Sequence, residues 1–199
     1  MTNAQGDFVW YELMTTDADA AQAFYEPLLG WSFADSGTPD VDYRIGSMAG
    51  TEVVGMMQLS EEMQLGGARP AWIGYIAVDE IGASIAALKD KGGQLFMEPN
   101  HLDGVGHMAM VADPQGAAFA LFKPSNAMEL PERDTPGNAS WVELNTTDWE
   151  NAWSFYSKLL DWEESSRMDM GEENGGTYFM FKAKGAPDEH SLGGMSNVA

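Results

Sequence analysis

Polar and apolar residues alternate near the start of the chain in a pattern that predicts a β-strand. Trp10, Glu12 and Met14 fall on one face of such a strand, because successive side chains of a strand point to opposite faces. The other face is wholly apolar and is expected to pack under a helix. It consists of Val9, Tyr11 and Leu13.

The spacing of apolar residues then changes to that of an amphipathic helix. Asp17 is the expected N-cap, since its carboxylate can accept hydrogen bonds from the first free backbone N–H groups. Gly30 suits the left-handed residue after the helix, while Pro27 is expected to distort the last turn. The predicted apolar stripe consists of Ala20, Ala21, Phe24 and Leu28.

The same pattern returns near the C-terminus. Residues 8–31 align without gaps to residues 139–162, and 12 of the 24 positions are identical. Asp148 is the second expected N-cap, and Asp161 takes the place of Gly30. A weaker likeness follows, in which Tyr43 matches Tyr178 and Gly55-Met56 matches Gly194-Met195.

A third, more distant copy lies between these two, at residues 71–95. Trp72 precedes Asp79 by seven residues, as Trp10 precedes Asp17, so Asp79 is the expected N-cap there. The stripe of this helix is predicted at Ile81, Ile85 and Leu88. Strands are then expected at 93–99, 106–113 and 117–124, with a type I turn at the sequence DPQG between the last two.

Each copy therefore predicts a β-α-β-β-β unit, and the fold class is α+β. The units span residues 8–59, 71–124 and 139–199. The proline-containing and polar segment 125–138 is the expected linker between two domains, 1–124 and 139–199.

Composition limits the binding partners and the cellular location that can be expected. The formal net charge is −21, which disfavours nucleic acid and anionic membranes as partners. No run of about 18 apolar residues is present, so no transmembrane helix is predicted. The chain has no cysteine and its first residues do not resemble a secretory signal, so a cytoplasmic location is expected.

The repeated units resemble the vicinal oxygen chelate superfamily, which includes glyoxalases, bleomycin-resistance proteins and extradiol dioxygenases. The motifs that carry the resemblance are FY..LLGW at the end of the first helix and DP.GA.F.L at the end of the second unit. The pattern W.EL.T.D before the helix is similar to a double-domain, glyoxalase-like branch of uncertain activity. The resemblance implies curled mixed sheets that pair as cups, with the helices outside.

On this resemblance, residues 1–124 form one complete domain of two units. Residues 139–199 form half of a second domain, whose other half is either absent from this chain or supplied by a second molecule. An unpaired sheet would expose an apolar face and a strand edge. We therefore predict a homodimer, or another form of self-association, through the third unit.

The resemblance also implies where a metal would bind. Members of the superfamily that use a metal carry a His, Gln or Glu on the first strand, seven residues before the capping Asp, and a Glu on the last strand. Here those positions hold Trp10, Trp72, Trp141 and, on the last strand of the second unit, Ala120. Indole and methyl groups do not coordinate divalent cations, so the usual metal site is not expected and no cofactor is predicted. A divalent metal at a non-standard site stays open as an alternative.

Glu12 and Glu143 occupy equivalent places and are expected to point into the cups. Three interpretations of these acids remain open: a structural carboxylate hydrogen-bonded to a backbone N–H or a tyrosine, a group that holds an amine or hydroxyl of a ligand, or a metal ligand or general base.

Three histidines complete the candidate chemistry. His107 is either a structural residue at a sheet edge or a proton donor or ligand group at the rim of a cup. His101 and His190 are expected in surface loops.

The sequence therefore leaves two functional hypotheses. The first is a small-molecule binding protein whose aromatic cup binds an apolar or aromatic compound without a metal. The alternative is a metal-dependent lyase, isomerase or dioxygenase with a non-standard site that includes Glu12 or His107. The candidate ligand-binding residues are Trp10, Glu12, Trp72, His107, Trp141 and Glu143.

Overall fold

The computed structural model describes residues 4–128, 130 and 135–198. Its contacts divide the chain into two compact units, each of which is described by itself. One unit contains Trp10–Tyr75 and residues 130 and 135–140. The other contains residues 4–9, Ile76–Met128 and 141–198. The predicted division into domains 1–124 and 139–199 stays a prediction.

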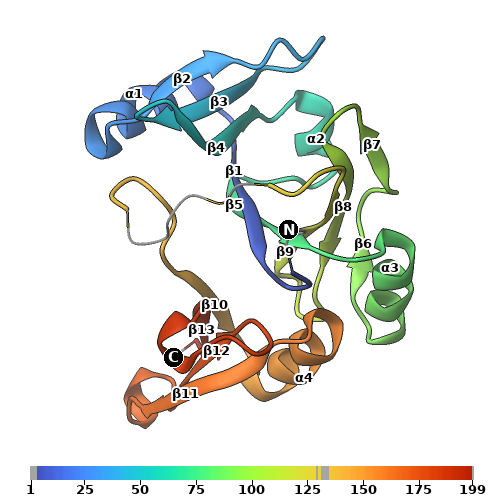
Figure 1. The fold of residues 1–199 in the computed structure, drawn as a ribbon, viewed down its shortest axis with the longest axis vertical. Helices are drawn as coiled ribbons and strands as arrows, with labels where there is room; N and C mark the ends of the chain where they lie inside the picture. Colours follow the sequence, from blue (N-terminus) through green and yellow to red (C-terminus); the bar gives the residue numbers. More distant parts are fainter. Residues whose placement is uncertain (1–3, 129, 131–134, 199) are drawn as a thin grey trace. The chain divides into compact units, whose positions relative to one another are not determined.

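The unit that contains Trp10–Tyr75 is built on one mixed sheet (Figure 1). The strand order is β2-β3-β4-β1-β5. β1 pairs with β4 in parallel, whereas β2, β3 and β4 pair antiparallel. The elements are β1 (Phe8–Thr15), α1 (Ala18–Leu29), β2 (Ser32–Asp35), β3 (Tyr43–Met48), β4 (Thr51–Gln58), α2 (Glu61–Leu65) and β5 (Ala71–Ala77).

The other unit holds the remaining elements of the second predicted repeat and all of the third. In the second repeat, β9, β8 and β6 are antiparallel neighbours, and β7 also pairs with β8. The elements are α3 (Ile81–Asp90), β6 (Gln94–Leu95), β7 (Asn100–Leu102), β8 (Gly106–Ala112) and β9 (Ala118–Pro124).

The third repeat forms a separate sheet with the order β10-β13-β12-β11. β10 pairs with β13 in parallel, as β1 does with β4 in the first repeat. The predicted α+β class with repeated β-α-β-β-β units is confirmed. The elements are β10 (Val142–Thr146), α4 (Trp149–Leu160), β11 (Glu163–Asp169), β12 (Thr177–Lys182) and β13 (Gly193–Asn197), with 3-10 turns at Glu172–Asn174 and Asp188–His190.

The helix caps agree with the sequence in two of three cases. Asp17 accepts a hydrogen bond from the Ala20 N–H at 2.9 Å, and Asp148 accepts one from the Asn151 N–H at 3.1 Å. The prediction for Asp79 is wrong, because Glu80 is the N-cap of α3 and makes no capping bond through its side chain. The second helix therefore begins one residue later than its spacing from Trp72 suggested.

The homologous helices α1 and α4 each end at a left-handed residue. Gly30 follows α1 with φ of 73° and Asp161 follows α4 with φ of 57°. Pro27 lies inside α1, which nevertheless continues to Leu29.

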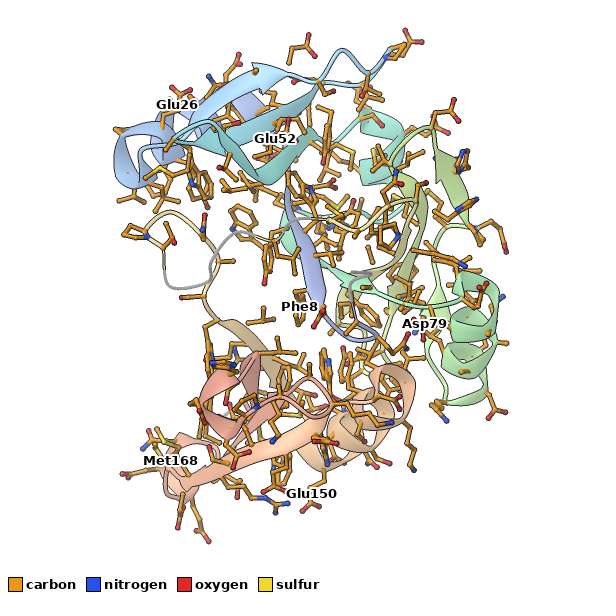
Figure 2. All side chains as sticks on the ribbon, in the orientation of Figure 1. Phe8, Glu26, Glu52, Asp79, Glu150 and Met168 are labelled. Carbon is orange, nitrogen blue, oxygen red and sulfur yellow. The ribbon has the colours of Figure 1, made fainter. Side chains whose placement is uncertain are left out.

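The main hydrophobic core joins the second and third repeats within their shared unit. Leu88 of α3, Leu121 of β9 and Leu160 of α4 are fully buried in one cluster. Trp162 stacks on Phe181 with ring centroids 4.3 Å apart. Phe8, labelled in Figure 2, packs against this cluster from the start of β1. These contacts bury the apolar face of α4.

The segment before β1 is held by the third repeat. The Trp162 indole donates to the Gly6 carbonyl at 2.9 Å, and the Gln5 amide donates to the Leu159 carbonyl at 3.0 Å. A Cβ at Gly6 would lie 2.8 Å from the Trp162 indole nitrogen, so this close approach requires glycine.

The equivalent apolar stripe of α1 is exposed at its two largest side chains. Phe24 is 59% and Leu28 is 61% exposed, whereas their counterparts Phe155 and Leu159 on α4 are buried. Periodicity identified the apolar face of both helices, but it could not show which face is covered.

No helix among the described residues is long and apolar enough to cross a membrane.

Candidate functional site

Glu12 lies in a group of side chains that three strands bring together. It is placed on β1 directly beside Gly55 on β4. Tyr43 crosses from β3 over Gly55, and a Cβ at that glycine would collide with the Tyr43 hydroxyl. The indole N–H of Trp10 donates to the same hydroxyl at 3.2 Å. The glycine therefore makes room for a Trp–Tyr–Glu arrangement.

A second tyrosine completes this group. The Tyr75 hydroxyl, from β5, donates to Oε2 of Glu12 at 2.9 Å. Tyr43 also hydrogen-bonds to the Glu12 carboxylate. Glu12 is only 4% exposed, and no described residue forms an ion pair with it. A buried acid is thus held by phenols rather than by a cation.

The electrostatics of the group follow from its burial. Burial raises the pKa of Glu12 above its ordinary value of 4.5, and the hydrogen bonds from Tyr75 and Tyr43 oppose that rise. Burial and the nearby Glu12 charge raise the pKa of both tyrosines. Both phenols consequently stay protonated and remain hydrogen-bond donors across the physiological range.

The third repeat reproduces the arrangement in an exposed setting. The Trp141 indole donates to the Tyr178 hydroxyl at 2.8 Å, and that hydroxyl donates to Oε2 of Glu143 at 3.0 Å. Gly194 is the register partner of Glu143, and it leaves room for Tyr178 in the same way. Glu143 is exposed and has no counterpart of Tyr75 among the described residues. The Asn145 amide also donates to its carboxylate, at 3.3 Å.

Trp72 lies away from the Glu12 group. It packs edge-on against Tyr25 at 5.6 Å and against Trp31 at 6.4 Å, and it is 45% exposed. Trp72 was matched to Trp10 by counting from Asp79, but α3 begins one residue later, after Glu80. Counted from the true cap at Glu80, the position five residues earlier is Tyr75, which is therefore the equivalent of Glu12. Trp72 is three residues from Tyr75 and points to the other face of the strand.

His107 lies in the other compact unit, on β8. It is exposed and faces His101 across the pair of β7 and β8, with ring centroids 4.4 Å apart. His101 also approaches Asp103, with Nε2 to Oδ1 at 3.2 Å. His101 therefore lies on a strand, not in the expected loop. Sequence spacing gave no sign of this histidine pair, because antiparallel pairing creates it.

The residues at the superfamily's usual metal positions do not fit a divalent cation. The Trp10 nitrogen is a hydrogen-bond donor, and Ala120 is a fully buried methyl group. No group of three or more His, Cys, Asp or Glu side chains in the described part of the chain could hold a metal ion. The chemistry of these positions is therefore that of hydrogen bonding and aromatic contact.

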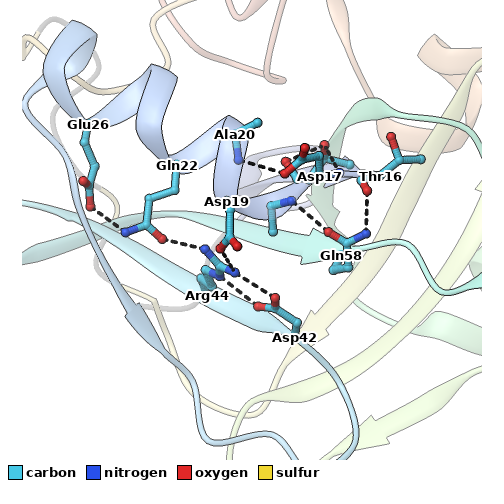
Figure 3. Close-up of polar contacts among 11 residues, drawn as sticks. Thr16, Asp17, Asp19, Ala20, Gln22, Glu26, Asp42, Arg44 and Gln58 are labelled. Atoms are coloured by element: carbon cyan, nitrogen blue, oxygen red, sulfur yellow. Dashed lines mark hydrogen bonds and ion pairs between the residues drawn. The ribbon is translucent and has the colours of Figure 1, made fainter.

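A second polar cluster surrounds Arg44 on β3 and was not predicted from the sequence (Figure 3). Its guanidinium donates to Asp42 at 2.8 and 2.9 Å, to Asp19 at 2.7 Å and to Gln22 at 2.8 Å. Gln22 in turn donates to Glu26 at 2.9 Å. Residues of this cluster line an open hollow of about 460 Å³. These partners occupy the hydrogen-bond donors of Arg44. Because two of them, Asp19 and Gln22, lie on α1, the cluster links α1 to the sheet.

Comparison with known proteins assigns the family. The sequence model of the Glyoxalase/Bleomycin resistance protein/Dioxygenase superfamily matches residues 7–121, more than half of the chain. The chain belongs to this superfamily. The resemblance inferred from the sequence motifs is thereby confirmed.

Curated members of the superfamily include longer relatives. The chain is 30% identical over 164 residues to a protein named putative glyoxylase CFP32 from Mycobacterium tuberculosis, covering 81% of this chain and 62% of that protein. It is 29% identical over 168 residues to the anthracycline biosynthesis protein DauV from Streptomyces sp. strain C5, covering 79% and 61%. The chain thus spans about three-fifths of the length of these relatives.

Solved structures of this superfamily share the fold. A Mn(II)-bound glyoxalase from Novosphingobium aromaticivorans superposes with a TM-score of 0.68 at 17% identity, covering 100% of this chain and 63% of that one. A homoprotocatechuate 2,3-dioxygenase variant from B. fuscum gives 0.66 at 16% identity, covering 98% and 55%. Identities this low establish the fold alone.

Proposed function

We propose that this chain binds a small apolar or aromatic molecule at the Glu12 group, without the divalent metal used elsewhere in the superfamily. The observation that carries the proposal is a carboxylate that is 4% exposed and has only tyrosine hydroxyls as partners among the described residues. A structural role alone would not require the burial of an acid, which is costly without a cation.

The chemistry of Glu12 defines the ligand. A carboxylate has about four acceptor sites, and the two phenols use two of them. The remaining sites suit a hydroxyl or amine donated by a ligand. Trp10 and Tyr43 add aromatic surface beside the acid, which favours a planar or apolar body attached to that donor. The similarity to a protein named for anthracycline biosynthesis supports an aromatic ligand of this kind.

The third repeat offers a similar half-site of Trp141, Tyr178 and Glu143. Because its acid is exposed, water competes for the same hydrogen bonds. Ligand affinity is therefore assigned to Glu12, and Glu143 supplies a matched control within the same chain.

The binding test compares Glu12→Gln with Glu143→Gln. Purified protein is titrated with hydroxylated naphthalenes and anthraquinones, and binding is followed by tryptophan fluorescence and calorimetry. We expect at least one compound to bind, with Glu12→Gln weakening it by about tenfold, or about 1.4 kcal/mol, and Glu143→Gln leaving it unchanged. The absence of binding by the whole panel, or equal affinity of Glu12→Gln and the unsubstituted chain, would refute the proposal.

The alternative function is a metal-dependent lyase, isomerase or dioxygenase with a non-standard site. The Mn(II)-bound structural neighbour and the relative named a putative glyoxylase support it. Elemental analysis of purified protein separates the two proposals. Stoichiometric Ni, Zn, Fe or Mn that survives dialysis in the unsubstituted chain and is lost in Glu12→Gln would favour the metal-dependent enzyme.

A further inference from the structure

Two of the three histidines of the chain lie opposite each other on neighbouring strands. His101 on β7 is the register partner of His107 on β8, and both side chains are exposed. Directly opposite residues of an antiparallel pair have Cβ atoms about 4.5–5.5 Å apart, so two short side chains can reach one point. The imidazole rings do approach each other, with centroids 4.4 Å apart and planes inclined by 39°. The pairing of β7 with β8 thus brings two ligand nitrogens together on the surface.

The separation of the two rings fits the coordination of a single metal ion. An imidazole nitrogen lies about 2.0–2.1 Å from a bound Zn²⁺, which places the centres of two rings on one ion roughly 4.5–5 Å apart. Neutral imidazole is a preferred ligand of Cu²⁺, Ni²⁺ and Zn²⁺, whereas Mg²⁺ and Ca²⁺ require oxygen ligands. We propose that His101 and His107 together bind one divalent transition-metal ion, Cu²⁺, Ni²⁺ or Zn²⁺, at a site separate from the Glu12 group.

The charges around the pair are compatible with a bound cation. Oδ1 of Asp103 lies 3.2 Å from Nε2 of His101. A carboxylate in that place orients a metal-bound imidazole by accepting its second N–H, so Nδ1 of His101 is the ligand atom. On the other side, Lys123 is the register partner of His107, and its ammonium pairs with Glu80 at 2.5 Å. A carboxylate therefore balances the positive charge beside the pair.

The site has two protein ligands. No third His, Cys, Asp or Glu side chain in the described part of the chain completes a metal-binding group with them. Water fills the remaining coordination positions, as it does in metal sites that keep an open position. Such an ion is held by the chelating pair alone, so losing either histidine removes the chelate.

A tight turn holds the two strands in register. The Val105 N–H donates to the Leu102 carbonyl at 2.9 Å, and Gly104 between them has φ of 76°, which favours glycine. Leu102 then pairs with Gly106. The Ser125 N–H donates to the Val105 carbonyl at 2.9 Å, which fastens the turn to the residue after β9. A site that is formed before the ion arrives loses less conformational entropy on binding.

A bound ion would hold β7 on β8. β7 contains only Asn100–Leu102, and its pairing in the described part of the chain is with β8. So short a strand opens readily, because few hydrogen bonds and little buried surface hold it. An ion that needs one histidine from each strand binds the closed form and stabilises it. Amide hydrogen exchange at Asn100–Leu102 should therefore slow when the metal is added.

Calorimetric titration of the full chain, made without a histidine tag and treated with a chelator, tests the site. Zn²⁺, Ni²⁺ and Cu²⁺ are added in turn, with excess Mg²⁺ to occupy surface carboxylates of this acidic chain. One equivalent of at least one of the three ions should bind. His101→Ala and His107→Ala should each weaken that binding by about tenfold or more, because a single imidazole remains. His190→Ala is the matched control: it removes an exposed histidine outside the pair and should leave the affinity unchanged.

Glu12→Gln separates this site from a metal at the Glu12 group, and it should bind the ion as the unsubstituted chain does. Binding that is lost in Glu12→Gln and kept in His107→Ala would overturn the inference. Stoichiometric binding of none of the three ions, or equal affinity of His107→Ala and the unsubstituted chain, would do the same. Thermal unfolding without metal should be alike for the histidine variants and the unsubstituted chain, since both rings are exposed. Exchange at Asn100–Leu102 that the metal leaves unchanged would contradict the joining of β7 to β8.

Discussion

At the scale of single residues, the same four-residue group behaves differently in two places. Trp, Glu, Tyr and Gly recur around Glu12 and around Glu143, with the same hydrogen bonds from indole to phenol and from phenol to acid. Glu12 is buried and Glu143 is not, because a strand of another repeat adds Tyr75 beside Glu12. The duplicated residues therefore specify local geometry, while the neighbouring repeat determines the environment of the acid.

This difference predicts a pH-dependent effect of Glu12→Gln on stability. Burial raises the pKa of Glu12, so its contribution to stability is fully present below the unfolded pKa and is lost as pH rises through the folded pKa. Gln does not titrate. The free energy of unfolding of Glu12→Gln, relative to the unsubstituted chain, should therefore increase between about pH 4 and pH 8.

Urea unfolding at both pH values measures this effect, with Glu143→Gln as the exposed control. A difference between Glu12→Gln and the unsubstituted chain that is the same at both pH values would contradict the assignment of a raised pKa to Glu12.

Sequence patterns predicted part of this site for clear physical reasons. Alternation placed Trp10 and Glu12 on one face, and the repeat alignment paired Tyr43 with Tyr178. The role of Tyr75 could not be predicted, because it reaches Glu12 from a strand 63 residues away. The spacing from Trp72 gave the wrong N-cap for the helix of the second repeat. The cap is Glu80 and not Asp79, so every strand position counted back from the cap moves by one residue.

At the scale of elements, α1 and α4 have nearly the same apolar stripe but opposite environments. Phe155 on α4 is buried in the core shared with α3, whereas Phe24 on α1 is exposed. The period of a helix identifies its apolar side but carries no information about what lies against it. Sequence could therefore predict both helices and their caps at Asp17 and Asp148, and it could not predict their burial.

The two phenylalanines should consequently differ in their effect on stability. Phe155→Ala leaves a cavity in the core and should lower the free energy of unfolding by about 3–5 kcal/mol. Phe24→Ala removes an exposed ring and should change it by no more than about 0.5 kcal/mol. Chemical denaturation of both variants makes the comparison, and similar losses for the two would show that the α1 face is covered in solution.

At the scale of the molecule, a buried hydrogen bond joins the second repeat to the third within one compact unit. Asp113 is fully buried at the turn between β8 and β9, and it accepts from the Gln115 and Ala117 N–H groups at 2.9 Å. The Tyr156 hydroxyl of α4 donates to its other oxygen at 3.1 Å. The turn motif that indicated the superfamily is thus also an anchor for the third repeat.

Tyr156→Phe should therefore destabilise this unit. The substitution leaves one carboxylate oxygen of Asp113 buried without its donor, which costs about 1–3 kcal/mol. The matched control is Tyr25→Phe, the equivalent change on α1, which removes no such bond among the described residues. Thermal unfolding of both variants should show a loss only for Tyr156→Phe; equal melting temperatures would mean that this bond does not couple the repeats.

The attachment of Gly6 to Trp162 has a consequence for the order of synthesis. These residues are 156 positions apart, and the bond between Gln5 and Leu159 spans 154. The segment before β1 therefore leaves the ribosome long before its binding place on the third repeat exists. Closing so long a loop is entropically costly and slow compared with local contacts. The bonds of this segment to Ala77 and Asp79 can form earlier, so the third repeat supplies the last contacts of a segment that is made first.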